Sequence, residues 1–167
     1  MSWTGSRVYF LLAFVGSMSA MGTAWYLEYG VGLKPCALSL TQRCFMLAFS
    51  LLCLAAAVHG PGRIGVRRYS AGGVALAVAG AAAASRQLWL QIHGTVAPEA
   101  CKPGLKYLLQ TQPLPDAARM LVWGSPECAR VNFKLLGMSV AEWSLLAFSV
   151  MAVFAIVQWL LSYRRGD

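Results

Sequence analysis

The chain has 167 residues, of which 58% are hydrophobic and only 12% are charged, and its mean hydropathy is +0.58. Soluble domains carry roughly 25% charged residues, and half that amount cannot cover a small globule with a wetted surface. The composition therefore excludes an ordinary soluble enzyme and a disordered tail. The formal net charge of +8 is scattered between apolar runs, which also excludes a nucleic-acid-binding module. The basic residues are expected to face anionic lipid instead.

Four stretches have the length that a bilayer requires, about 20 apolar residues at 1.5 Å rise each. In hydrocarbon every backbone polar group must bond internally, so these stretches are predicted to be helices. The sequence thus predicts an all-α membrane protein, a four-transmembrane-helix bundle that forms one integral membrane domain over residues 1–167. The predicted spans are residues 8–27, 38–58, 70–90 and 143–161.

The third predicted span is rich in glycine and alanine. Gly73, Ala77 and Ala81 recur every four residues, and so do Gly80 and Ala84. Small residues at this spacing allow helix backbones to approach closely. This stripe is therefore expected to be a helix-packing face and not a ligand site.

The connections between the spans predict their orientation. Residues 59–69 form a short segment with three arginines and no acid, whereas residues 28–37 and 91–142 mix basic and acidic residues. An even number of spans places both termini on the same side as residues 59–69. Dense arginine in short segments marks the cytoplasmic side. Residues 1–27 have one alternative, a cleaved signal peptide, which would leave the remaining topology unchanged.

The five cysteines fall into two groups. Cys44 and Cys53 lie inside the second span and are expected to be small apolar fillers. Cys36, Cys101 and Cys128 lie in the two outer connections, where disulfides persist if the compartment is oxidising. A structural disulfide between Cys101 and Cys128 is the simplest hypothesis, and it would stabilise the fold by roughly 3–4 kcal/mol.

Cys36 lies in a distinctive setting. Pro35 suits the first position of a helix, which places Cys36 in the first turn. The helix N-terminus and Lys34 are both expected to lower the pKa of the Cys36 thiol. Ser39 and Arg43 follow at helical spacing, about 60° and 20° from the direction of Cys36. One helix face is thus predicted to carry a thiol, a hydroxyl and a guanidinium, a candidate functional site; the alternative for Arg43 is snorkelling to the headgroups.

These features together resemble the DsbB family of bacterial inner-membrane disulfide-generating proteins. The family motif Lys-Pro-Cys-x-x-Cys, with Glu/Gln-Arg shortly after, is matched by residues 34–39 and by Gln42-Arg43. The family's second cysteine pair corresponds to Cys101 and Cys128. Residues 86–93 resemble its third-span exit, and residues 136–143 resemble the start of its fourth span. The similarity covers the whole chain, but Ser39 stands where the family has a cysteine.

The resemblance implies a membrane thiol:quinone oxidoreductase that reoxidises a DsbA-like periplasmic thioredoxin-fold protein and passes the electrons to ubiquinone or menaquinone. It implies a multi-pass protein of the bacterial inner (cytoplasmic) membrane, in contact with lipid, with cytoplasmic termini and periplasmic cysteine loops. No metal and no nucleic acid is expected. The implied catalytic positions are Cys36, Ser39 (for the missing cysteine), Cys101 and Cys128, and the implied quinone-binding residues are Arg43 and His93. The alternative for His93 is a polar tip in the headgroups.

Turnover is expected to be impaired, because the Ser39 hydroxyl forms no disulfide. The preferred explanation is an engineered Cys→Ser change that traps the cycle, and a natural variant is the alternative. Two disulfide states stay open from sequence: Cys101–Cys128 with Cys36 reduced, or a trapped Cys36–Cys128 bond.

The long connection is expected to carry a short interfacial helix. Its leucines at 105, 108 and 109 follow helical spacing, Pro113 and Pro115 are expected to break the chain, and the apolar residues 120–123 follow. Such a helix would keep Lys102 and Lys106 among headgroups. The alternative is a packed loop helix without lipid contact.

Two other functions fit parts of the pattern. One is a vitamin-K-epoxide-reductase-like quinone reductase, although its membrane cysteine pair normally follows the loop pair. The other is a non-enzymatic four-span protein with one structural loop disulfide.

Overall fold

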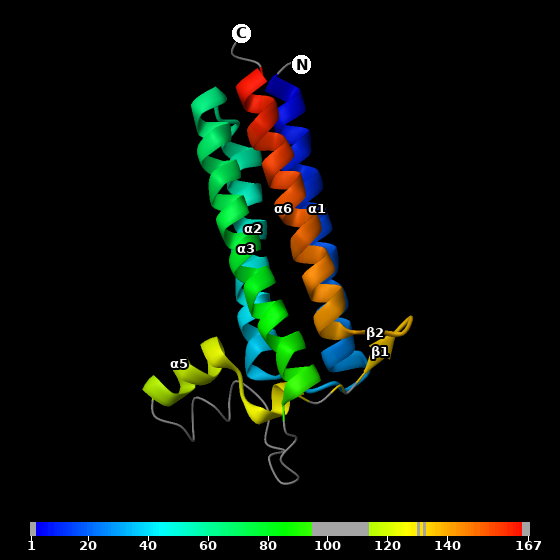
Figure 1. Ribbon diagram of the computed structural model, residues 1–167. Coiled ribbons are helices and arrows are strands. Elements are labelled where there is room, and N and C mark those ends of the chain that lie inside the picture. The colour runs from blue at the N-terminus through cyan, green and yellow to red at the C-terminus, as the bar shows by residue number, and fades with distance from the viewer. Residues whose placement is uncertain (1–2, 95–113, 130, 132, 165–167) are drawn as a thin grey trace.

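The computed structural model describes residues 3–94, 114–129, 131 and 133–164, and it forms a bundle of four long helices (Figure 1). Among the described residues, these four helices are long and apolar enough to cross a membrane. The predicted all-α, four-helix membrane architecture is therefore confirmed. The helices are α1 (Trp3–Trp25), α2 (Ala37–His59), α3 (Arg63–His93) and α6 (Val140–Arg164).

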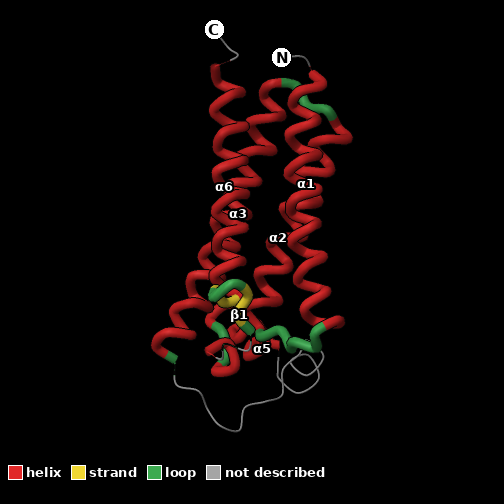
Figure 2. Tube along the Cα trace, turned by 90° about the vertical axis from the view of Figure 1, so that its right-hand side faces the viewer, coloured by secondary structure: helices red, strands yellow, loops and turns green. Residues whose placement is uncertain are grey.

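The short elements gather at one end of the bundle, opposite the end where α1 starts and α6 finishes (Figures 1 and 2). The π-helical turn η1 continues α1, and a two-stranded antiparallel hairpin pairs Lys134 with Ser139 just before α6. The sequence did not predict this hairpin. The short elements are η1 (Tyr26–Gly30), α5 (Leu114–Trp123), the 3-10 turn η2 (Pro126–Ala129), β1 (Lys134–Leu135) and β2 (Met138–Ser139).

The helices extend beyond the predicted spans, most clearly in α3. This helix begins at Arg63, so the predicted connection 59–69 shrinks to residues 60–62. Gly60 adopts φ +58°, and its N–H donates to the Ala56 carbonyl at 3.0 Å, which ends α2 in a left-handed cap. The Arg67 guanidinium lies 3.8 Å from the centre of a tyrosine ring on α6. Arg67 is thus accommodated within the helix by neighbouring aromatic surface.

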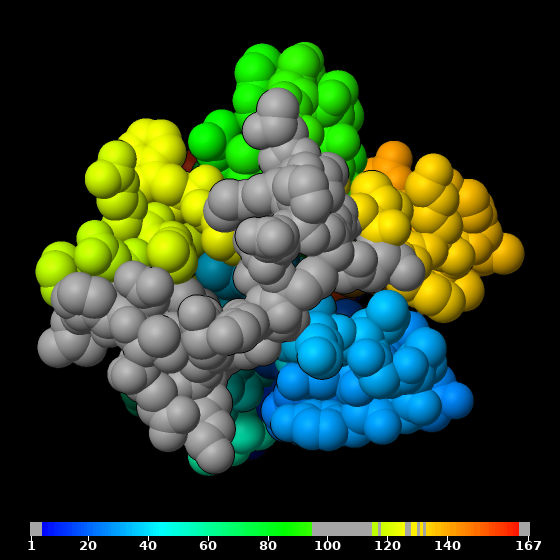
Figure 3. All heavy atoms as spheres, turned by 90° about the horizontal axis from the view of Figure 1, so that it is seen from below, coloured from blue at the N-terminus to red at the C-terminus, as the bar shows by residue number. Residues whose placement is uncertain are grey.

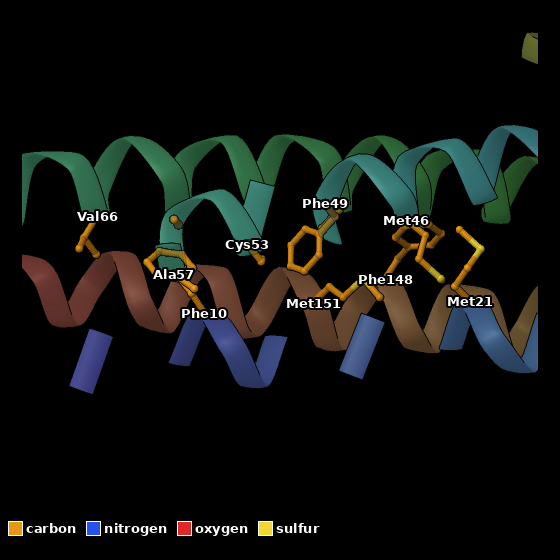
Figure 4. Close-up of a cluster of buried hydrophobic side chains, with 11 residues drawn as sticks. Phe10, Met21, Met46, Phe49, Cys53, Ala57, Val66, Phe148 and Met151 are labelled. Carbon is orange, nitrogen blue, oxygen red and sulfur yellow. The ribbon is translucent and has the colours of Figure 1, made fainter. Parts of the chain in front are cut away.

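The predicted glycine and alanine stripe of α3 packs against the other helices. At Gly80 the backbone of α3 lies very close to α6, since a Cβ there would lie 2.2 Å from the Phe148 ring. Figure 4 shows Phe148 beside Phe49, Met46 and Met21 in the core. The prediction of a packing face is confirmed, although the stripe alternates steps of four and three, as left-handed helix packing requires. Its buried members are Val66, Ser70, Gly73, Ala77, Gly80, Ala84 and Gln87, with Ala81 half-buried beside them.

The first span is an integral part of this bundle. Phe10 and Met21 belong to the buried core. The hydroxyls of Ser17 and Ser50 share a buried hydrogen bond of 2.6 Å between α1 and α2. These contacts favour a retained first span over the alternative of a cleaved signal peptide.

Candidate active site

A cavity of about 420 Å³ lies at the end of the bundle that carries the short elements. Its walls come from α1, η1, α2, α3, α6 and the segment around β1, and apolar side chains such as Leu27, Phe133 and Val140 form much of its surface. Cavities of this size and character are typical of small-molecule sites. The chemically versatile residues that line it are Glu28, Lys34, Cys36, Ser39, Gln42, Arg43, Gln87 and Gln91.

Cys36 is the N-cap residue of α2. Its backbone is extended, with φ −80° and ψ 170°, and the helix begins at Ala37. Pro35 therefore precedes the helix, and the expected placement of Cys36 inside the first turn is wrong by one position. The N-cap position still brings the thiol next to the first N–H groups of the helix.

Cys36, which lines the cavity, meets Cys128 of the turn η2, which is not itself a lining residue. The two thiols share a hydrogen bond. The Ser125 hydroxyl lies 3.7 Å from the Cys128 sulfur, and Cys128 is only 1% exposed. Among the described residues, Cys36, Cys44, Cys53 and Cys128 are free thiols. The fold thus juxtaposes two of the predicted redox cysteines.

The electrostatics of this pair correct an expectation from the sequence. The Cys128 thiol and burial raise the pKa of Cys36, and these effects outweigh the backbone N–H groups of Ser39 and Leu38, which lower it. The hydrogen bond from Cys36 lowers the pKa of Cys128 to about 6, against the opposing effect of burial. The expected depression of the Cys36 pKa is therefore wrong, since the half-buried Cys36 and the buried Cys128 share one proton. Cys128 is the more acidic thiol of the pair.

Ser39 and Arg43 line the same cavity as Cys36, one and two turns into α2. The Arg43 guanidinium pairs with the Glu28 carboxylate and donates to the Ala24 carbonyl at 3.1 Å. Arg43 therefore points across to the end of α1, in place of the alternative of snorkelling to the headgroups. Sequence reasoning missed Glu28, although an acid at the end of a span close to a span arginine is a usable signal.

A group of side-chain amides was also missed. Gln42 Nε2 donates to Gln87 Oε1 at 2.7 Å, and both side chains are buried. Gln91 Oε1 accepts a hydrogen bond of 3.1 Å from the Ser139 hydroxyl, which ties α3 to the hairpin. Buried amides carry more donors and acceptors than one bond satisfies, so they supply hydrogen-bonding capacity to the cavity wall.

A capping box fixes the hairpin side of the cavity. The N–H of Ser139 donates to the Glu142 carboxylate, and the Ser139 hydroxyl accepts from the Glu142 N–H at 3.3 Å. This reciprocal arrangement starts α6 at a defined residue. The Trp143 indole N–H donates to the Leu135 carbonyl at 3.0 Å and holds β1 against the helix.

Two predicted site residues in the described part of the chain, His93 and Cys128, are not among the residues that line the cavity. The His93 ring is exposed and stacks on Trp89, with ring centroids 4.2 Å apart, and it is not among the lining residues. Cys44 is exposed on α2, and Cys53 is a buried core residue, as expected for a small filler. Cys101 lies outside the described residues.

The helix of the long connection is α5, and it flanks the end of the bundle (Figure 3). This helix begins at Leu114, so Pro115 lies in its first turn. The prediction that Pro115 breaks the chain is therefore wrong, because a helix tolerates proline in its first turn. Thr41 Oγ1 donates to the Leu121 carbonyl at 2.7 Å, and Arg86 Nε donates to the Trp123 carbonyl at 3.3 Å. The predicted leucines at 105, 108 and 109 and the lysines at 102 and 106 lie outside the described residues.

The faces of α5 differ. Two of its backbone carbonyls accept hydrogen bonds from side chains of α2 and α3. The side chains of Val122 and Trp123, by contrast, are 66% and 61% exposed. An amphipathic helix with this division suits the boundary between lipid and water.

Comparison with known proteins gives consistent matches over nearly the whole chain. A family model for the disulfide bond formation protein DsbB matches residues 6–158. Disulfide bond formation protein B of Stutzerimonas stutzeri (strain A1501) is 42% identical over 154 residues, which are 92% of this chain and 94% of that protein. Disulfide bond formation protein B 1 of Pseudomonas aeruginosa (strain PAO1) is 44% identical with the same coverage.

Proposed function

Because the chain belongs to the DsbB family of membrane disulfide bond formation proteins, we propose that it reoxidises a soluble periplasmic dithiol oxidase of the DsbA type and passes the electrons to a membrane quinone, ubiquinone or menaquinone. The chain is a multi-pass bacterial membrane protein and a disulfide oxidoreductase. This membership favours that activity over both alternatives raised from the sequence. The observation that carries the proposal is the meeting of Cys128 with Cys36, which lines the cavity.

The cavity suits a quinone ring. Its walls are largely apolar, while Arg43 and the amides of Gln42, Gln87 and Gln91 offer polar partners for quinone oxygens. A quinone supplies a two-electron acceptor of higher potential than a DsbA-type dithiol, which lies near roughly −120 mV. We assign Arg43 to the quinone oxygens or to a thiolate at position 39. A contact of His93 with the quinone stays a prediction, since its ring lies against Trp89.

The exchange reactions follow from thiol acidity. A partner thiolate attacks a Cys101–Cys128 disulfide at Cys101, forms a mixed disulfide there and releases Cys128 as thiolate. The second partner thiol then displaces Cys101, so the partner is oxidised and the cysteine pair is reduced. The low pKa of Cys128, about 6, makes it a good leaving group. Cys36 stabilises that thiolate by donating its hydrogen bond.

Position 39 determines whether the cycle continues. With a cysteine at that position, disulfide-bonded to Cys36, the Cys128 thiolate would attack Cys36 and release the new cysteine as a thiolate next to Arg43. Ser39 offers no such bond, so the chain as written is proposed to stop after one exchange. Either disulfide, Cys101–Cys128 or Cys36–Cys128, fits the oxidised state before that exchange, and after it the chain as written holds these cysteines reduced. An engineered substitution remains our preferred explanation for Ser39.

We place Cys36 and Cys128 in the periplasm and both termini in the cytoplasm. The support is the group of arginines at the opposite end of the bundle, where Arg63, Arg67 and Arg68 lie in the first turns of α3. The cavity would then lie near the periplasmic surface of the membrane.

The decisive experiment compares the chain as written with its Ser39→Cys variant in lipid nanodiscs that contain ubiquinone. A reduced thioredoxin-fold partner is added, and quinone reduction is followed by ultraviolet absorbance. The Ser39→Cys variant is expected to turn over many times, and the chain as written at most once. A folded, quinone-loaded Ser39→Cys variant without turnover would refute the proposal.

A further inference from the structure

Both hydrogen bonds that Arg43 donates lead to the end of α1. One reaches the Glu28 carboxylate and the other the Ala24 carbonyl. Ser39 precedes Arg43 by one helical turn on α2, and both residues line the cavity. The end of α1 therefore decides where the guanidinium lies relative to position 39.

The π-helical turn η1 gives Glu28 this role. Leu27 and Glu28 line the cavity, whereas Tyr26 and Tyr29 are 69% and 82% exposed. A π turn widens the helix locally, and such turns are frequent at functional sites. The turn thus directs the Glu28 carboxylate into the cavity and leaves Tyr26 and Tyr29 exposed on the surface.

The ion pair also sets the charge of the cavity. The side chains of Arg43 and Glu28 are only 17% and 23% exposed, so solvent screens their charges incompletely. The other charged lining residue among those described is Lys34, which is exposed. Glu28 is hence the carboxylate that offsets the field of Arg43 at position 39.

We propose that Glu28 is a positioning residue for the oxidation step: its carboxylate holds the Arg43 guanidinium in the cavity that position 39 also lines and limits the positive field there. This inference rests on the proposed function, in which a thiolate at position 39 is the electron donor. The two roles are separable. Glutamine keeps an acceptor oxygen of similar reach but removes the charge, whereas alanine removes both.

The first measurement is the acidity of the thiol that Ser39→Cys introduces, in a background with Cys36→Ala so that no neighbouring thiol shares its proton. The protein is reduced in nanodiscs without quinone, and the pH dependence of iodoacetamide alkylation at position 39 is read by peptide mass spectrometry. Glu28→Gln is expected to raise the acid dissociation constant of this thiol about tenfold. Asp116→Asn, which removes an exposed carboxylate on α5, is the matched control and is expected to change nothing.

The second measurement is quinone turnover of Ser39→Cys variants that retain Cys36. Glu28→Ala is expected to lower kcat at least about tenfold, because Arg43 loses its anchor, while Glu28→Gln retains more activity. A thiol titration in Glu28→Gln identical to that of Asp116→Asn would overturn the inference, and the Glu28→Gln arm decides even if Glu28→Ala fails to fold. If the Ser39→Cys parent reduces no quinone, the proposed function fails, but the titration still tests Glu28.

Discussion

The thiol of Cys36, at the N-terminus of α2, shares a hydrogen bond with the thiol of Cys128, in the turn η2. Cys36 is half-buried and Cys128 is buried, and the two thiols hold one proton between them, because a second negative charge beside the first would be unfavourable. The relationship joins the short outer connection to the long one and places the exchange chemistry beside the cavity.

The acidity of Cys128 should depend on Cys36. In the fully reduced protein, the alkylation rate of Cys128 is expected to titrate with a midpoint near pH 6. Cys36→Ala removes the main stabilising donor, so the midpoint should move toward the ordinary thiol value of about 8.5. Peptide-resolved mass spectrometry measures both profiles, with Cys44→Ala as the control. An unchanged midpoint in Cys36→Ala would refute the shared proton.

The same pair predicts a pH dependence of stability. Between about pH 6 and 8.5 the unfolded chain binds two protons at these thiols and the native pair binds one, so stability rises with pH. Above this window the unfolded thiols ionise while Cys36, whose pKa is raised, stays protonated, so the gain is lost. Unfolding midpoints at pH 6 and pH 8 should therefore differ more in the reduced parent than in Cys128→Ala. Equal differences would contradict the prediction.

Oxidation of the chain as written should join Cys36 to Cys128 readily, since their side chains already touch. Mild oxidation followed by non-reducing peptide mapping is expected to yield this crosslink, or the Cys101–Cys128 bond with Cys36 free. Cys36→Ala should leave only the latter. A product that links Cys36 mainly to Cys44 would contradict the assignment, because Cys44 lies exposed on α2.

The contact of α3 with α6 should be intolerant of added volume. A Cβ at Gly80 would lie 2.2 Å from the Phe148 ring, so Gly80→Ala is expected to destabilise the bundle by about 1–3 kcal/mol. Gly16→Ala on α1 meets no atom within 4 Å and serves as the control, with no loss expected. Thermal unfolding in detergent compares the two. Equal melting temperatures would show that the helices separate more easily than the packing indicates.

The attachment of α5 should depend on Thr41. Its hydroxyl donates to the Leu121 carbonyl at 2.7 Å, so Thr41→Val is expected to weaken the contact by about 1 kcal/mol. Hydrogen–deuterium exchange over residues 114–123 should quicken, while exchange in α3 stays constant. Ser149→Ala, a hydroxyl that bonds only within α6, is the control.

The sequence by itself determined the four spans, the packing stripe of α3 and the family. Continuous apolar length and four-residue spacing of small residues are local properties, and a bilayer leaves helices as the solution for such segments. Helical spacing likewise placed Ser39 and Arg43 on one face. The predictions from sequence were wrong at helix ends, in residues 59–69 and at Pro115. Tertiary contacts and capping decide where a helix ends.

Only the tertiary structure decided which groups meet. The contact of Cys36 with Cys128, the pairing of Arg43 with Glu28 and the bond of Gln42 to Gln87 join segments distant in the chain. The acidity of Cys36 shows why this matters. The helix N-terminus lowers its pKa, as the sequence indicated, but a buried thiol neighbour brought in by the fold raises it more. Electrostatics depend on distance in space, which a linear spacing does not contain.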